Sequence, residues 1–185
     1  MAEGAGRTAG LGDADFRLDP PLDEPTSRRL VEIWVDVSNA GGAVGFPPPP
    51  PEVTIEDVAP VAEKAFRSIR EGSDHIVVAY LRNSAVGFAF LEHRPGPLFR
   101  HWATIKRLQI APSFQQRGYG QQLLLACHEL ARSIGLEQLH LTVRGGTGTE
   151  AFYEAHGYRL IARIPDAIRV SPADTREELY MVVRL

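Results

Sequence analysis

Two glycines, Gly118 and Gly120, separate an apolar run that ends at Ile110 from a helical pattern that includes Leu123. Apolar and β-branched residues predict a strand for the first segment, and apolar residues spaced three and four apart predict a helix for the second. The first N–H groups of a helix have no partner within it, and glycines let an anion approach the backbone closely. The segment therefore predicts a strand, a phosphate-binding turn and a helix.

Spacing excludes two common phosphate loops. A dinucleotide-binding turn needs a third glycine three residues after the second one, where this chain has Leu123. A P-loop needs Gly-Lys followed by Ser or Thr, and the sequence contains no such run. Neither NAD(P) nor ATP is expected to supply the phosphate.

The patterns on either side of the turn predict a mixed α/β sheet with helices on both faces. Two amphipathic helical patterns come first, and the apolar runs His75–Leu81 and Ala85–Leu91 then form a predicted hairpin. After the turn the order is helix, strand, short helix and two strands, which forms one layered α/β unit. We expect a single domain over residues 14–185, preceded by a disordered segment over residues 1–13.

Composition narrows the function classes. The 185 residues carry a net charge of −3, so overall charge does not favour a nucleic-acid partner. The single cysteine, Cys127, cannot form an internal disulfide and lies in an apolar helical pattern, where a buried thiol is expected. No run approaches the ~18 apolar residues that a membrane span needs, and the N-terminus lacks an apolar signal segment. We expect a cytoplasmic chain with neither nucleic acid nor membrane as partner.

The stretch QQRGYG resembles the acyl-CoA pyrophosphate loop of the GNAT superfamily of N-acetyltransferases, through Gln115, Gly118 and Gly120. The later stretch AFYEAHGY lies where this family has its next helix, and the resemblance covers about residues 75–185. It implies a single-domain GNAT fold with about six to seven mostly antiparallel strands and about four helices. It also implies an acyl-CoA-dependent N-acetyltransferase that uses acetyl-CoA without a metal, in a family where homodimers are common.

The resemblance further implies which residues hold acetyl-CoA. Strand residues Leu108, Gln109 and Ile110 would lie along the acetyl group and the pantetheine arm, with main-chain N–H groups polarising the acetyl carbonyl. The turn would wrap the pyrophosphate through its backbone N–H groups, and Gln115 and Arg117 could add side-chain contacts. The residues expected in this turn are Gln115, Gln116, Arg117, Gly118, Tyr119, Gly120 and Gln121.

Tyr153, within AFYEAHGY, matches the position where many members of the family carry a tyrosine that protonates the departing thiolate. A phenol suits this role because its ordinary pKa near ~10 keeps it protonated at neutral pH. The competing interpretation is an aromatic side chain of the core whose hydroxyl is hydrogen-bonded.

The residue at the position of the general base, which would take the proton from the amine, departs from the family pattern. Several members carry a glutamate on the strand before the loop, where this chain has Thr104, and threonine is no useful base at neutral pH. Glu92, at the end of the preceding strand, is the nearest acidic substitute. His93 and His101 titrate in the right range but lie beside a Pro/Gly-rich turn, and water could also take the proton.

The acceptor is expected to be a primary amine of a small molecule, such as an antibiotic, toxin or metabolite. Gly146-Thr147-Gly148 and the C-terminal tail resemble acetyltransferases of the tabtoxin-resistance type. Four acidic residues are expected in or near a loop between the last two strands, where they would suit a cationic acceptor: Asp166, Asp174, Glu177 and Glu178. The run Pro47–Pro51 is expected to be a stiff polyproline II segment that could form the other wall.

Two alternatives remain open. The acceptor could be a protein N-terminus or lysine. Alternatively, the chain could be a non-catalytic acyl-CoA sensor, an interpretation that threonine in place of glutamate at position 104 allows. Release of thiol with a panel of amines and peptides separates the three.

Overall fold

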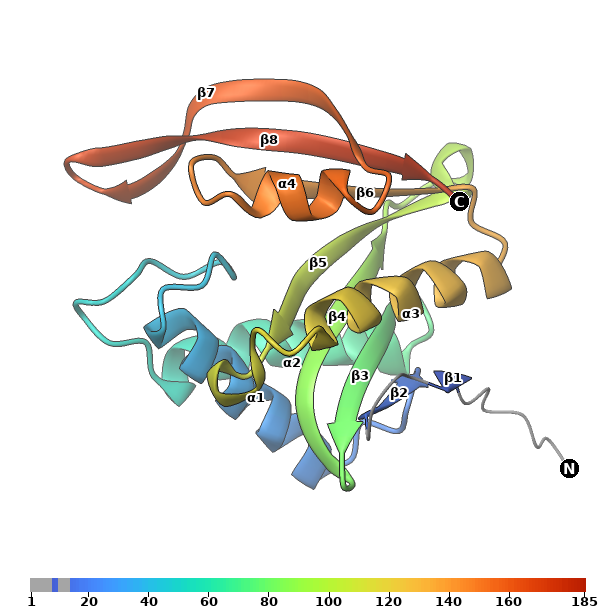
Figure 1. Ribbon diagram of the computed structural model, residues 1–185. Helices are drawn as coiled ribbons and strands as arrows, with labels where there is room; N and C mark the ends of the chain where they lie inside the picture. Colours follow the sequence, from blue (N-terminus) through green and yellow to red (C-terminus); the bar gives the residue numbers. More distant parts are fainter. Residues whose placement is uncertain (1–7, 10–13) are drawn as a thin grey trace, which may run out of the picture.

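The computed structural model describes residues 8–9 and 14–185, and every strand in it joins one sheet (Figure 1). The strands are β1 (Thr8–Ala9), β2 (Ala14–Leu18), β3 (His75–Leu81), β4 (Ser84–His93), β5 (Trp102–Ile110), β6 (Gln138–Arg144), β7 (Arg159–Ser171) and β8 (Asp174–Arg184). The order across the sheet is β1-β2-β3-β4-β5-β6-β8-β7, and only the β5–β6 pair is parallel. Since β1 has two residues, seven strands have five residues or more, as predicted. The disorder expected for residues 1–13 falls mostly outside the described residues.

Four α-helices cover the two faces of the sheet: α1 (Glu24–Asn39), α2 (Ile55–Arg70), α3 (Tyr119–Ser133) and α4 (Thr149–Glu154). One core packs α1 and α2 against the sheet, around Trp34, Phe66 and Phe88. The other core packs the buried faces of α3 and α4 against the opposite side, around Leu123 and Tyr153. The predicted arrangement of helices on both faces is confirmed.

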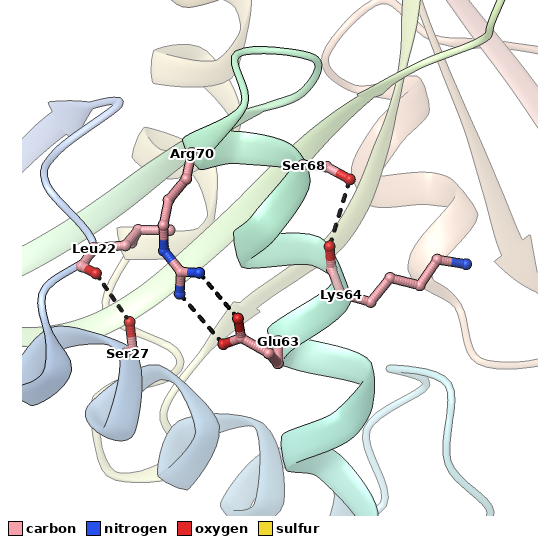
Figure 2. A network of polar contacts seen from close by, with 6 residues as sticks. All are labelled: Leu22, Ser27, Glu63, Lys64, Ser68 and Arg70. Atoms are coloured by element: carbon pink, nitrogen blue, oxygen red, sulfur yellow. Dashed lines mark hydrogen bonds and ion pairs between the residues drawn. The ribbon is translucent and has the colours of Figure 1, made fainter.

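Local signals explain where the first helices begin. The Asp23 carboxylate accepts a hydrogen bond from the Thr26 N–H at 2.9 Å and so caps α1. Thr54 and Asp57 form a capping box at the start of α2. Figure 2 shows an exposed ion pair of α2, in which the Arg70 guanidinium donates two hydrogen bonds to the Glu63 carboxylate.

The centre of the sheet opens between β5 and β6. These strands pair only at their beginnings, where Trp102–Thr104 lie beside residues 138–140, and they diverge beyond Thr104. On the other edge of β5, the register against β4 shifts between Phe88 and Phe90, and Arg107 takes a positive φ of 56°. This is a β-bulge, which redirects the side chains on the strand that carries it. The opening and the bulge lie on the same stretch of β5.

Two expectations from the sequence are wrong in detail. The expected loop is only the turn at residues 172–173, because β7 and β8 continue as a long hairpin, so Asp166 and Glu177 lie in strands and Asp174 is the residue next to the turn. The proline run is not one continuous polyproline II segment, since the bonds Pro49–Pro50 and Pro50–Pro51 are cis. Among the described residues, no helix is long and apolar enough to cross a membrane.

Candidate active site

A cavity of about 630 Å³ lies where β5 and β6 diverge. One wall is the α1–α2 loop at residues 43–48, which includes Pro47 and Pro48, and another is residues 168–170 of β7. Between them lie Ile105–Leu108 of β5, with Tyr153 of α4 also in the lining. The cavity thus brings together two residues expected in the site, Leu108 and Tyr153, and the proline run expected to form a wall.

The backbone of β5 offers hydrogen-bond donors at the opening between the strands. The Ala111 N–H donates to the Val86 carbonyl at 2.8 Å, and so points toward β4. Backbone groups alternate between the two edges of a strand, so the N–H groups of Leu108 and Ile110 point toward the edge that β6 has left. A carbonyl oxygen placed between β5 and β6 would face these two donors.

The side chains of Gln109 and Ile110 do not reach the cavity. Both are buried, Ile110 in the core under α3 and Gln109 opposite Phe88 of β4. Neither the amide nitrogen nor the carbonyl oxygen of the Gln109 side chain has a hydrogen-bond partner among the described residues. Only the main chain at these positions can contact a donor substrate beside β5.

The glycine turn ends in α3, as predicted. Gly118 is the N-cap residue of α3 with a φ of 81°, and Gln116 also has a positive φ of 60°. No backbone carbonyl within the described chain accepts a hydrogen bond from the N–H groups of residues 116–121. The space above Gly120 is open, since a Cβ there would meet no atom within 4 Å. The turn therefore presents unpaired N–H groups at a helix N-terminus, which fits a pyrophosphate.

The longer side chains of the turn lie in three different surroundings. The Gln115 side-chain amide donates to the Ile110 carbonyl at 2.8 Å, so it joins the turn to the end of β5. Arg117 is exposed, and its guanidinium lies 5.8 Å from the centre of the Phe114 ring. Tyr119 packs against the core under α3. Of these three, Arg117 has the side chain that extends into solvent beside the turn.

Tyr153 is a buried residue with its phenol at the cavity. Its side chain packs against Phe152 and Tyr158, with ring centres 5.1 and 5.5 Å away. Burial raises the pKa of Tyr153 to about 12, so the phenol keeps its proton at neutral pH. Its hydroxyl makes no hydrogen bond to the part of the chain that the structure describes, and is thus available to a substrate.

Glu92 lies next to the cavity without lining it. It pairs with Thr104 across β4 and β5, and its carboxylate forms an ion pair of 2.6 Å with Lys106. Lys106 does line the cavity. Among the described residues, the carboxylate in the lining is that of Glu178, on β8, which accepts a hydrogen bond from the Tyr180 hydroxyl at 3.0 Å.

Of the four acidic residues expected beside the acceptor, only Glu178 lines the cavity. Asp174 is paired with Arg176, Glu177 is paired with Arg163, and Asp166 accepts a hydrogen bond from Thr175. The hairpin directs these three carboxylates to its own surface, so they do not line the cavity.

The cavity instead contains four cationic side chains that the sequence interpretation missed: Lys106, Arg107, Arg144 and Arg169. A signal was present in β5, where Lys106 and Arg107 interrupt an otherwise apolar strand pattern. Arg144 and Arg169 carry no comparable signal, because they come from β6 and β7 and meet at the cavity only when the sheet is assembled. No group of three His, Cys, Asp or Glu residues in the described chain could hold a metal ion.

Comparisons with known proteins agree with this architecture. Residues 72–160 match the family model of the acetyltransferase (GNAT) domain. The yncA protein of Salmonella typhimurium, solved with its cofactor acetyl-CoA, is 15% identical, with 94% of this chain and 95% of that chain covered and a TM-score of 0.74. An N-acetyltransferase of Staphylococcus aureus Mu50 is 14% identical over 94% and 99% of the two chains, with a TM-score of 0.75. The ribosomal-protein-alanine N-acetyltransferase of Brucella melitensis is 21% identical over 88% and 96%, with a TM-score of 0.71.

These structures share the fold, and the family match spans the hairpin, the glycine turn and the helix of Tyr153. The fold and the family predicted from the sequence are both confirmed. Residues 72–160 form a GNAT acetyltransferase domain.

Proposed function

We propose that the chain transfers an acetyl group from acetyl-CoA to the primary amine of a small molecule. The observation that carries this proposal is the cavity at the opening between β5 and β6, where Tyr153 and the donor-bearing strand at Leu108 meet. The glycine turn supports it, because its unpaired N–H groups suit the pyrophosphate of the same donor. The expected turn residues, Gln115–Gln121, act mainly through their main chain.

Each residue has a defined role in a direct transfer. Acetyl-CoA supplies an activated acyl thioester. The N–H groups of Leu108 and Ile110 stabilise the negative charge that builds on the acetyl oxygen as the amine attacks. A C–N bond forms, the C–S bond breaks, and Tyr153 gives its proton to the sulfur. The proton lost by the amine balances the one given by Tyr153, so one proton is released when the substrate enters as an ammonium ion.

Two carboxylates can take the proton from the amine. Glu178 lines the cavity and is the better placed of the two. Glu92 is held by Lys106, so it acts on the site only through that ion pair or through water. We therefore rank Glu178 ahead of Glu92 as the base.

The walls of the cavity favour a small acceptor over a protein. Residues 43–48 and residues 168–170 stand on two sides of it, which suits a compact amine better than an extended peptide. Acetylation of a protein N-terminus is the second candidate, because one similar structure is a ribosomal-protein-alanine N-acetyltransferase. The tabtoxin-resistance subtype, a homodimer and a cytoplasmic location stay predictions.

The role of Tyr153 is tested by removing only its hydroxyl. Tyr153→Phe should lower kcat about 100-fold, the usual effect of losing a general acid, while the Kd of acetyl-CoA stays unchanged. Tyr80→Phe is the matched control. Tyr80 is 6% exposed and Tyr153 is 8% exposed, but Tyr80 lies in the core under α1 and α2. A wild-type rate for Tyr153→Phe would remove Tyr153 from the mechanism.

Thiol release from acetyl-CoA, measured with a panel of small amines and short peptides, tests the reaction itself. Release with small amines alone supports the proposal. Release with peptides alone favours the protein acetyltransferase, and binding of acetyl-CoA without any release indicates an acyl-CoA sensor.

A further inference from the structure

The cavity has a charge opposite to that of the whole chain. The protein carries a net charge of −3, yet the lining contains four cations, Lys106, Arg107, Arg144 and Arg169, and one carboxylate, Glu178. Glu92 neutralises Lys106, which leaves three guanidinium groups. Within the described residues, Arg107, Arg144 and Arg169 form no ion pair.

Arg107 is held in place by the fold. The bulge gives it a positive φ, and its guanidinium lies 5.3 Å from the centre of the Trp34 ring. Gly45 of the α1–α2 loop packs so closely against this guanidinium that a Cβ there would collide with it. Burial lowers the pKa of Arg107, and attraction to the Glu92 carboxylate partly offsets this effect. The surroundings thus hold a partly desolvated cation at the cavity.

The contact with Trp34 explains why the Arg107 side chain lies at the cavity. It does not explain the positions of the other two guanidinium groups. Arg144, at the end of β6, donates to the Gly41 carbonyl at 3.3 Å, and Arg169 comes from β7. Three separate segments therefore bring arginines to one cavity. Like charges repel, and their shared location is favourable when an anion lies among them.

The pyrophosphate of the donor is not that anion. Within the described chain, the cavity lining includes no residue of the glycine turn and none of α3. The lining comes instead from β5, β6, β7, β8 and residues 43–48, with Tyr153 from α4. The arginines lie on the acceptor side of the site.

We propose that the acceptor is a zwitterionic amine, an amino acid or a close analogue in which an acid group lies a few bonds from the reacting nitrogen. This inference rests on the proposed function. Arg107, with Arg144 and Arg169, binds the acid group through charge-assisted hydrogen bonds, and Glu178 accepts from the ammonium group before the proton leaves. Polyamines and aminoglycosides would meet three unpaired guanidinium groups and are excluded as good substrates.

The test compares amines that differ only in the acid group. Thiol release from acetyl-CoA is measured for the common amino acids and aminoalkylphosphonates, and for the carboxamide and decarboxylated amine of each amino acid. For the best acceptor, kcat/KM should exceed that of its carboxamide about tenfold or more, the usual effect of a charge-assisted hydrogen bond. Equal or faster reaction of the uncharged or dicationic amines overturns the inference and leaves the acetyltransferase standing. No release with any amine or peptide overturns both.

Variants assign the effect to the cavity. Arg107→Met and, independently, Arg169→Met should each reduce the advantage of the acid over its carboxamide, with the KM of acetyl-CoA unchanged. Arg176→Met is the control, because Arg176 is paired with Asp174 outside the cavity, and it should keep the full advantage. A rise in the KM of acetyl-CoA without a change in acid preference would assign these arginines to the donor and overturn the inference.

Discussion

The proposed donor side and the proposed acceptor side of the site are built from different parts of the chain. On the proposed donor side, N–H groups come from one continuous turn, residues 116–121, and from the adjacent end of β5. On the proposed acceptor side, side chains come from residues 43–48 and from four strands. Main-chain donors depend on a local backbone conformation, whereas a cluster of side chains depends on the whole fold. The donor can therefore be inferred from a short motif, and the acceptor cannot.

The largest expected effect comes from a substitution at Gly118, which should impair the donor side and spare the acceptor side. Gly118→Val places a β-branched residue at a φ of 81°, which costs about 1–3 kcal/mol and displaces the N–H groups of the turn. Loss of charge-assisted hydrogen bonds should raise the Kd of coenzyme A about tenfold or more, as measured by calorimetry. The KM of the acceptor should change little.

Gly135→Val is the matched control for this variant. Gly135 also has a φ of 81°, just beyond the other end of α3, and its surroundings are open. It should lose similar stability without losing affinity for coenzyme A. Equal affinity in both variants would show that the turn does not hold the donor.

A smaller effect is expected when the acceptor wall is loosened. The Asn39 side chain donates to the Val53 carbonyl at 2.9 Å and accepts from the Val53 N–H at 2.8 Å, and so closes the loop that contains residues 43–48. Asn39→Ala leaves both backbone groups of Val53 unpaired, which should cost about 1–3 kcal/mol in the free energy of unfolding. We expect the KM of the acceptor to rise severalfold and that of acetyl-CoA to stay unchanged.

Ser68→Ala provides the comparison for Asn39→Ala. The Ser68 hydroxyl makes a long hydrogen bond of 3.4 Å on the exposed face of α2, far from the loop in sequence (Figure 2). The Ser68→Ala variant should keep the KM of the acceptor, the KM of acetyl-CoA and the free energy of unfolding near their wild-type values. If Asn39→Ala raised the KM of acetyl-CoA instead, the separation of the two sides would fail.

The same contrast explains how much the sequence could predict. Hydrophobic periodicity located the hairpin of β3 and β4, and the spacing of Gly118 and Gly120 located the start of α3. The position of Arg107 could not be predicted, because it depends on a bulge that follows from the register between β4 and β5. The length of the last hairpin was missed because nothing in the local pattern indicated that β7 and β8 continue to residues 171 and 174.

The smallest expected effect concerns the helix that carries the donor turn. His128 of α3 is buried, and one of its ring nitrogens lies 3.1 Å from the Tyr158 hydroxyl. Burial, with repulsion from Arg132 and His156, lowers the pKa of His128 to about 4 from its usual 6.5. Between these two pH values the unfolded chain binds a proton that the folded chain does not. The free energy of unfolding should therefore fall as the pH decreases from 6.5 to 4, and this contribution should level off below 4.

Urea unfolding at pH 7, 5.5 and 4 checks this dependence. His128→Gln removes the titrating group but keeps a side chain that can form a hydrogen bond, so its unfolding free energy should fall less between pH 7 and pH 4 than that of the wild type. The difference between the two slopes isolates His128 from carboxylates such as Glu63, whose usual pKa of 4.5 lies at the acid end of this range and whose lowered pKa in the folded chain is common to both proteins. If the two slopes were identical, the burial of a neutral His128 would not account for the loss of unfolding free energy at low pH. Because α3 supports the donor turn, the affinity for coenzyme A should decrease together with the stability at low pH. On the acceptor side, the hydrogen bonds between Asn39 and Val53 contain no group that titrates in this range.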